Sequence, residues 1–429
     1  MNKKIIKNAS WIIVCRIAES MINLVVSMIT ARYLGPSNYG VITYASSLVA
    51  FILPVVRLGI NGILVQEFIE HPKKDGCIIG TATLLTTLSS LLGILGIWAF
   101  TSVVNHNEID TIIVSVLYSI SLFFQMTEMI QYWYQARLLS KYVAIISLIA
   151  RIFVSVYKIY IVVEGKTIFW FAVVNSLDYL LISVGLFVIY FKLGGRRISF
   201  STEVASNMFS RSKHFIISGL MVSVFGQTDK IMLKLLCGDA QSGYYSAAIT
   251  CAGMSAFLFS AIIDSFRPII FEYKKKNQSA YKESVVLLYS VNIYIALIQS
   301  VVLSLFADFV INLLYGKEFL IAADILKIVT WYSAFSYLGS ARSIWFLAEG
   351  KEKYIWITNL IGAVINLLGN FILIPIWGAC GAALSSVATQ LLTNFALNFI
   401  IKPIQENGML MIYALNPKQI YKMIVNSKS

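Results

Sequence analysis

Charged side chains inside long apolar stretches are the residues of this sequence whose types and spacing could do chemistry. A charge at the centre of a bilayer costs at least ~2.5–3.5 kcal/mol, so such residues normally face protein or water. The charges in question include Arg57, Glu128, Arg151, Lys158 and Asp178, and each lies within an apolar stretch. The pattern predicts a wet, charged interior in the first half of the chain.

Motifs for catalysis are missing from the sequence. No Gly-rich loop ending in Lys-Ser/Thr is present, and neither is an HExxH motif or an arrangement of Ser, His and Asp that we can place. The three histidines are far apart, and the five cysteines are scattered singly without CxxC spacing. We therefore expect no metal, no cofactor and no enzyme activity.

The composition is that of a polytopic membrane protein. The chain has 429 residues, 58% hydrophobic and 13% charged, with a mean hydropathy of +0.77. A membrane span needs about 20 mostly apolar residues. Such stretches begin near positions 10, 39, 77, 110, 142, 167, 214, 243, 285, 322, 354 and 379. The sequence predicts an all-α fold of about 12 transmembrane helices.

The net charge of +13 is explained by where the basic residues lie relative to these spans, so it does not point to nucleic-acid binding. Most basic residues outside the spans fall in the segments on the same side as the amino terminus. The positive-inside rule then places both termini in the cytoplasm.

A hairpin of two apolar helices occurs twice. A shift of 203 residues places Gly35 on Gly238 and Gly40 on Gly243. The second helix of each copy keeps small and polar residues on one face. These are Thr43, Ser47, Ala50, Pro54, Arg57 and Asn61 in the first copy and Ser246, Thr250, Gly253, Phe257, Ser260 and Asp264 in the second. The stripes either face a wet cavity or pack helices together.

The hairpin turn, the stretch from Asp229 to Ala248 and the run from Gly350 to Gly381 resemble a known family. The chain is similar to Wzx-type O-antigen and polysaccharide flippases of the multidrug/oligosaccharidyl-lipid/polysaccharide exporter superfamily. The resemblance implies two six-helix lobes related by a parallel repeat, with a central cleft. The expected parts are an N-terminal lobe (1–191), a cytoplasmic linker (192–213), a C-terminal lobe (214–401) and a cytoplasmic tail (402–429).

The cargo that this resemblance implies is an undecaprenyl-diphosphate-linked oligosaccharide, moved across the bacterial cytoplasmic membrane by alternating access. Arginine donates paired hydrogen bonds to phosphate. The expected diphosphate ligands are Arg16, Arg57 and Arg267, with Arg151, Lys158 and Lys230 extending the basic surface. The expected sugar ligands are Gln125, Tyr132 and Asn175. The carboxylates Glu19, Glu128 and Asp178 either neutralise arginines or couple transport to H⁺ or Na⁺.

Two other functions are weighed against the flippase. A drug or cation antiporter of the same superfamily would favour acidic or aromatic cavity walls, against which the basic residues inside the spans argue. A membrane glycan polymerase usually has a sizeable external loop, and none is expected here. By resemblance, the partners of a flippase are the bilayer lipid and the glycosyltransferases and polymerase of its pathway.

Overall fold

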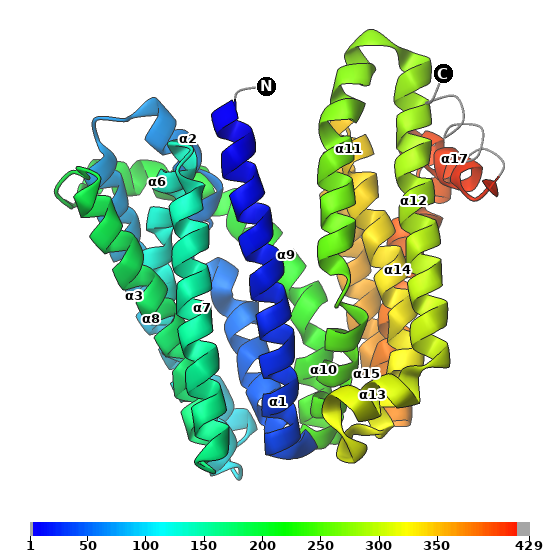
Figure 1. The fold of residues 1–429 in the computed structure, drawn as a ribbon, viewed down its shortest axis with the longest axis horizontal. Coiled ribbons are helices and arrows are strands. Elements are labelled where there is room, and N and C mark those ends of the chain that lie inside the picture. Colours follow the sequence, from blue (N-terminus) through cyan, green and yellow to red (C-terminus); the bar gives the residue numbers. More distant parts are fainter. Residues whose placement is uncertain (1–2, 418–429) are drawn as a thin grey trace. The chain divides into compact units, whose positions relative to one another are not determined.

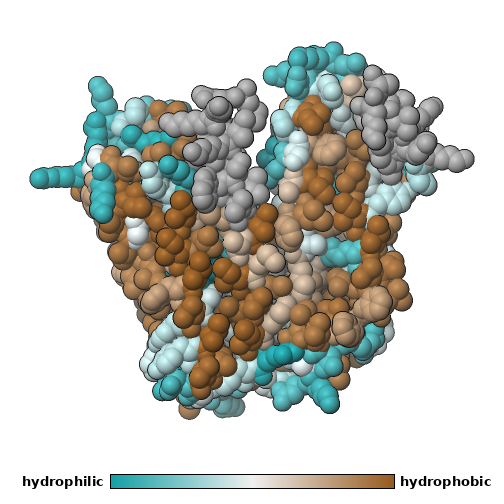
Figure 2. All heavy atoms as spheres, in the orientation of Figure 1, coloured by the Kyte–Doolittle hydropathy of each residue, from teal (hydrophilic) through white to brown (hydrophobic). Residues whose placement is uncertain are grey.

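The computed structural model describes residues 3–417, and it contains helices but no strand within that range. The chain divides into two compact units, Met1–Ile231 and Met232–Ser429 (Figure 1). On the visible face of each unit, hydrophobic residues cover the middle of the helices and hydrophilic residues gather at their ends (Figure 2). This distribution is that of membrane-spanning helices and confirms the predicted all-α polytopic fold class.

The first unit is a bundle in which α1 packs along α7 and α4, and α8 packs along α4, α5 and α7. Its helices are α1 (Lys3–Val56), α2 (Leu64–Glu70), α3 (Asp75–Val104), α4 (Ile109–Ser119), α5 (Ser121–Gln125), α6 (Ile130–Ala136), α7 (Ser140–Val163), α8 (Ile168–Lys192) and most of α9 (Thr202–Cys237), with 3-10 turns at Ile60–Gly62 and Met126–Met129. A buried apolar core includes Trp133, Tyr134 and Tyr190.

The second unit is a bundle centred on α14, which packs against α10, α11, α12 and α15. Its helices are α10 (Asp239–Ala252), α11 (Ala256–Lys276), α12 (Gln278–Leu305), α13 (Ala307–Tyr315), α14 (Ile321–Ala348), α15 (Lys353–Leu391), α16 (Leu397–Ile400) and α17 (Gln405–Ala414), with a π-helical turn at Leu392–Ala396. Its core includes Tyr281, Tyr289 and Trp345.

The number of spans comes close to the prediction once the broken helices are divided. Among the described residues, eight helices are long and apolar enough to cross a membrane, or nine if α10 and α11 form one bent span. Two of the eight contain a residue with non-helical backbone angles, Gly35 in α1 and Gly378 in α15. Each therefore has room for two spans, which brings the number among the described residues to ten or eleven, against the predicted twelve or so.

The backbone angles at the turn of each hairpin support the predicted internal repeat. Gly35 has φ 70° and ψ 173°, and Gly238, its partner in the overlay, has φ 86° and ψ 178°. This region is essentially restricted to glycine, because a Cβ atom would clash with the backbone. The same rare conformation at both overlaid positions indicates that the two hairpins turn in the same way.

The boundaries of the two compact units differ from the predicted lobes and linker. The division lies inside α9, between Ile231 and Met232. Helix α9 already begins at Thr202, and the segment before it packs on α3, where the Ser199 N–H donates to the Gly76 carbonyl at 3.2 Å. The expected linker is therefore partly helix and partly packed chain, because its polar groups have partners on the first unit.

The expected cytoplasmic tail also begins as packed structure. Helix α17 packs on α12, and Met411 is fully buried. The hydroxyl of Tyr289 donates to Asn407 Oδ1 at 2.5 Å. Residues 418–429 of the expected tail lie outside the described residues.

The conformation of Gly238 gives a test of the repeat turn. No atom lies within 4 Å of a Cβ built on Gly238, so Gly238→Ala introduces backbone strain without a clash. We expect a loss of about 1–3 kcal/mol in the free energy of unfolding, measured in detergent micelles. Gly226→Ala is the control, because a Cβ built on Gly226 also has no atom within 4 Å, but Gly226 lies within the helix α9. Equal stability of the two variants would contradict the assignment.

Candidate functional site

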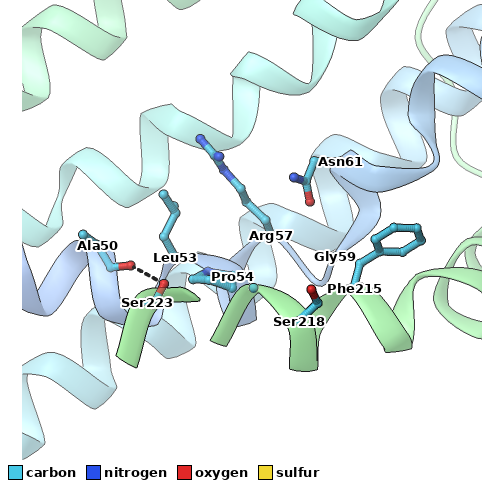
Figure 3. A pocket seen from close by; sticks show the side chains of 10 residues that line it. Ala50, Leu53, Pro54, Arg57, Gly59, Asn61, Phe215, Ser218 and Ser223 are labelled. Carbon is cyan, nitrogen blue, oxygen red and sulfur yellow. Dashed lines mark hydrogen bonds between the residues drawn. The ribbon is translucent and has the colours of Figure 1, made fainter. Parts of the chain in front are cut away.

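Arg57 follows the last residue of α1, between Pro54 and a turn of the chain. Pro54 has no N–H, so it cannot donate to the carbonyl of Ala50 as a helical residue would. The hydroxyl of Ser223 on α9 donates to that carbonyl instead, at 3.2 Å (Figure 3). The chain then turns through Leu58 and Gly59, which both have positive φ. This turn leaves Arg57 at the end of the helix, beside a cavity.

The guanidinium of Arg57 pairs with a carboxylate, and the Arg57 side chain also lines the cavity. Its Nη2 lies 2.9 Å from Glu128 Oε2, and the two side chains are 24% and 16% exposed. Its Nε is buried and makes no hydrogen bond to the described residues. The cavity, of about 290 Å³, is lined by Ala50, Leu53, Pro54, Arg57, Gly59, Asn61, Phe215, Ser218, Gly219 and Ser223 (Figure 3). Arg57 therefore keeps one donor that has no acceptor among the described residues.

A second ion pair joins α7 to α8. Arg151 Nη1 lies 2.5 Å from Asp178 Oδ2, and the aspartate is only 2% exposed. Lys158 makes no ion pair within the part of the chain that the structure describes. Arg151 and Lys158 both line a cavity of about 180 Å³. Its other walls are Asn23, Val26, Ser27, Thr30, Tyr39, Ile42, Thr43, Ser46, Tyr118, Val154 and Ser155.

The structure places Arg16 and Glu19 in a third cavity of the first unit, of about 320 Å³. The two residues lie one helical turn apart on α1. The remaining walls come from α6 and α7 and are mostly polar. They are Gln131, Gln135, Ser140, Val143, Ala144 and Ser147. The sequence did not predict that Gln135 and these serines would line the same cavity.

The predicted polar stripe of the second helix reaches these cavities at most of its positions. Thr43 lines the cavity of Lys158, and Ala50, Pro54, Arg57 and Asn61 line the cavity of Figure 3. Ser47 is instead buried and donates to the Thr43 carbonyl. Five of the six predicted stripe positions in the first unit therefore line cavities, whereas Ser47 is packed inside the protein.

Several predicted ligands lie elsewhere. Gln125 is only 4% exposed and donates to Ser121 Oγ at 3.5 Å. Tyr132 is half-buried against the core of the first unit, and Asn175 is half-buried on α8. Lys230 is half-buried on α9. None of these four lines the three cavities described above.

The predicted span from about residue 110 is not one regular helix. A 3-10 turn at Met126–Met129 separates α5 from α6, so the polar residues before and after it do not share one face. This change of helical period explains why Gln125 is buried while Glu128 reaches Arg57.

Two buried carboxylates that the sequence did not single out are paired at the ends of helices in the first unit. Asp75 accepts hydrogen bonds from Trp133 Nε1, at 2.8 Å, and from Arg137. Glu67 pairs with Arg211 on α9. Each pair joins segments far apart in the chain, so we interpret them as structural.

The two arginines of the second unit make other contacts than those of the first unit. Arg267 is 52% exposed, and its Nη2 lies 3.6 Å from Asp264 Oδ1. Arg342 is buried, and its guanidinium donates to the Thr393 carbonyl at 2.5 Å and to Thr358 Oγ1 at 3.2 Å. Thr393 belongs to the π-helical turn, where the irregular backbone offers a carbonyl to the arginine.

No group of three or more His, Cys, Asp or Glu side chains that could hold a metal occurs among the described residues.

The Arg151–Asp178 pair gives a test of the charged interior. Asp178→Asn leaves a guanidinium without its counter-charge, so we expect the free energy of unfolding in detergent to fall by about 3 kcal/mol. The double variant Arg151→Met/Asp178→Leu should lose less, because no unpaired charge remains. Glu272→Gln is the control, because the exposed pair of Glu272 and Lys276 contributes little. Equal unfolding of Asp178→Asn and the control would show that the buried pair contributes nothing.

Comparison with known proteins identifies the family. Residues 5–274 match the family described as "Polysaccharide biosynthesis protein". The chain is 28% identical over 229 residues to an uncharacterized membrane protein, MJ1068, of Methanocaldococcus jannaschii, and 24% identical over 204 residues to the probable low-salt glycan biosynthesis flippase Agl15 of Haloferax volcanii. These matches cover 50% and 47% of this chain and only 45% and 42% of those relatives, so the chain spans less than half of their length.

A third relative is matched along its whole length. The chain is 21% identical over 408 residues to the capsular polysaccharide biosynthesis protein CapF of Staphylococcus aureus, which covers 93% of this chain and 100% of CapF.

Solved structures agree with the fold. The lipid II flippase MurJ in an inward closed conformation superposes with a TM-score of 0.69 at 14% identity, covering 94% of this chain and 90% of MurJ. An inward-facing multidrug resistance MATE transporter of the MOP superfamily gives 0.62, also at 14% identity, covering 90% and 96%. The chain therefore belongs to the polysaccharide biosynthesis protein family and has the fold of the multidrug/oligosaccharidyl-lipid/polysaccharide superfamily.

Proposed function

We propose that this protein is a flippase that moves an undecaprenyl-diphosphate-linked oligosaccharide across the bacterial cytoplasmic membrane. The product would supply O-antigen, capsule or another surface polysaccharide, and both termini would lie in the cytoplasm. Two of the relatives carry names that refer to glycan biosynthesis and capsular polysaccharide biosynthesis, which supports this substrate class. The protein would act with the glycosyltransferases and polymerase of its pathway.

The observation that carries the proposal is the state of Arg57. Its side chain lines a cavity and is 24% exposed, and its buried Nε has no acceptor among the described residues. A buried donor without a partner calls for a water or an ion. Arginine binds phosphate through parallel hydrogen bonds, so a diphosphate is a suitable ligand.

Other cations would extend this surface. Arg151 and Lys158 share the smaller cavity, and Arg16 lies at the third. Lys230 and Arg267 stay proposed ligands of the diphosphate. Gln125, Tyr132 and Asn175 stay proposed ligands of sugar, and for Gln125 its burial argues against direct contact with a ligand.

Glu128 suggests how transport could be coupled to an ion. Arg57 cannot direct the same N–H groups at both Glu128 and a diphosphate. Protonation of Glu128, or capture of the carboxylate by Na⁺, would release Arg57 for the substrate. Return of the charge would restore the pair at 2.9 Å and help to expel the diphosphate. Asp178 and Glu19 are further candidates for the coupling ion.

A drug antiporter of the same superfamily is the alternative. The cavities favour it less, because arginine or lysine lines each of the three. A cationic drug would be repelled by these side chains unless their carboxylate partners faced it.

Transport of the glycolipid in proteoliposomes tests the role of Arg57. Loss of one charged hydrogen-bonding group is worth about 1.5–3 kcal/mol, so Arg57→Ala should slow the wild-type rate at least about tenfold. Arg57→Lys should retain part of the rate, because it keeps the charge but not the two-pronged geometry. Arg197→Ala is the control, since Arg197 is exposed and lies outside the cavities.

Two outcomes would contradict this prediction. A wild-type rate for Arg57→Ala would exclude Arg57 as a phosphate ligand. A wild-type protein that exports a cationic dye but leaves the glycolipid in its original leaflet would favour the antiporter.

The coupling role of Glu128 has its own test. We expect Glu128→Gln to transport glycolipid at a rate that no longer responds to an imposed proton gradient, because glutamine cannot change its charge. Glu203→Gln, at the exposed start of α9, should keep the response of the wild type. A variant Glu128→Gln that still responds to the gradient would remove Glu128 from the coupling mechanism.

A further inference from the structure

We propose that the cavity between α1, α6 and α7 binds sugar hydroxyls of the lipid-linked oligosaccharide, an inference that rests on the proposed function. The cavity has a volume of about 320 Å³. Small-molecule sites usually measure about 300–1,000 Å³, so there is room for part of a glycan chain. Both α1 and α7 belong to membrane-spanning segments, in which a polar wall needs an explanation.

The walls of this cavity are polar but balanced in charge. Two carboxamides, two hydroxyls, one guanidinium and one carboxylate face it, against only two apolar side chains, Val143 and Ala144. The single positive charge of Arg16 and the single negative charge of Glu19 give a lining with no net charge. Such a lining holds neither a bare anion nor an organic cation strongly.

Sugar hydroxyls match this lining group by group. Each sugar hydroxyl both donates and accepts a hydrogen bond. The carboxamides of Gln131 and Gln135 and the hydroxyls of Ser140 and Ser147 likewise offer both functions. A site that hydrogen-bonds hydroxyls discriminates against ligands that lack them, because its polar groups would stay unpaired.

The helical spacing turns these groups toward one space. Gln131 and Gln135 are four residues apart on α6, and Ser140 and Ser147 are seven apart on α7, so each pair lies on one face of its helix. Ala144, between the two serines, has a short side chain and leaves the cavity open.

The position of the cavity fits the loading of a glycolipid. Arg137 directly follows the last residue of α6, and Lys141 is the second residue of α7. Both basic residues therefore lie near the short connection between these two helices. The positive-inside rule assigns such a connection to the cytoplasm, where the proposed substrate is made.

Binding of two lipids by the purified protein tests the inference. One lipid is the pool of lipid-linked oligosaccharides extracted from the source cells, and the other is undecaprenyl diphosphate without sugar. We expect Gln135→Ala to weaken binding of the glycosylated pool about tenfold, as the loss of a hydrogen-bonding side chain predicts. Ala144→Trp, which fills the cavity, should weaken it further. Neither variant should change the affinity for undecaprenyl diphosphate.

Ile149→Trp is the matched control, since it adds the same side chain to α7 at a position that is 62% exposed. It should bind both lipids as the wild type does. Equal weakening of both lipids by Gln135→Ala and Ala144→Trp would overturn the sugar site and leave the flippase proposal standing. A wild-type protein that binds the glycosylated pool no better than undecaprenyl diphosphate would also overturn it. Failure of the wild type to bind either lipid would instead remove the proposed function.

Discussion

The structure depends on one constraint, which is that hydrocarbon offers no hydrogen bonds. Every charge and backbone group that lies within the membrane must find its partner inside the protein. In the first unit, the arginines of the interior meet carboxylates from other segments, Arg57 with Glu128 and Arg151 with Asp178. In the second unit, Arg342 meets a backbone carbonyl and a hydroxyl. These contacts decide which helices can be neighbours.

The same constraint governs the backbone. Pro54 withdraws one donor from α1, and the first unit replaces it with the hydroxyl of Ser223 from α9. The exchange ties the end of α1 to α9 at the position where Arg57 borders a cavity. At the hairpin turns, Gly35 and Gly238 supply the same rare backbone conformation, so two helices can follow each other with almost no connecting loop.

Hydrophobic runs and glycine positions predicted most of the fold. The apolar stretches predicted where helices begin, and the overlay of Gly35 on Gly238 predicted equivalent turns. The sequence named Glu128 and Asp178 as carboxylates that could neutralise arginines, and both do. A pattern along one helix does not reveal the helix that faces it, so which arginine each of them meets was not predictable. The 3-10 turn at Met126–Met129 was hidden for a related reason, because no proline or glycine marks it. The burial of Gln125 and the convergence of Gln135 with Ser147 both follow from such tertiary placement.

The two ion pairs of the first unit suit different tasks. Asp178 is almost fully buried, so separating it from Arg151 would leave a carboxylate in a poorly solvated site. Arg57 and Glu128 are both partly exposed beside a larger cavity, and water can solvate each of them when they part. A pair that takes part in a transport cycle must separate and re-form at a modest cost in free energy. The Arg57–Glu128 pair meets this condition better than the more deeply buried Arg151–Asp178 pair, so Glu128 is the stronger of the two coupling candidates.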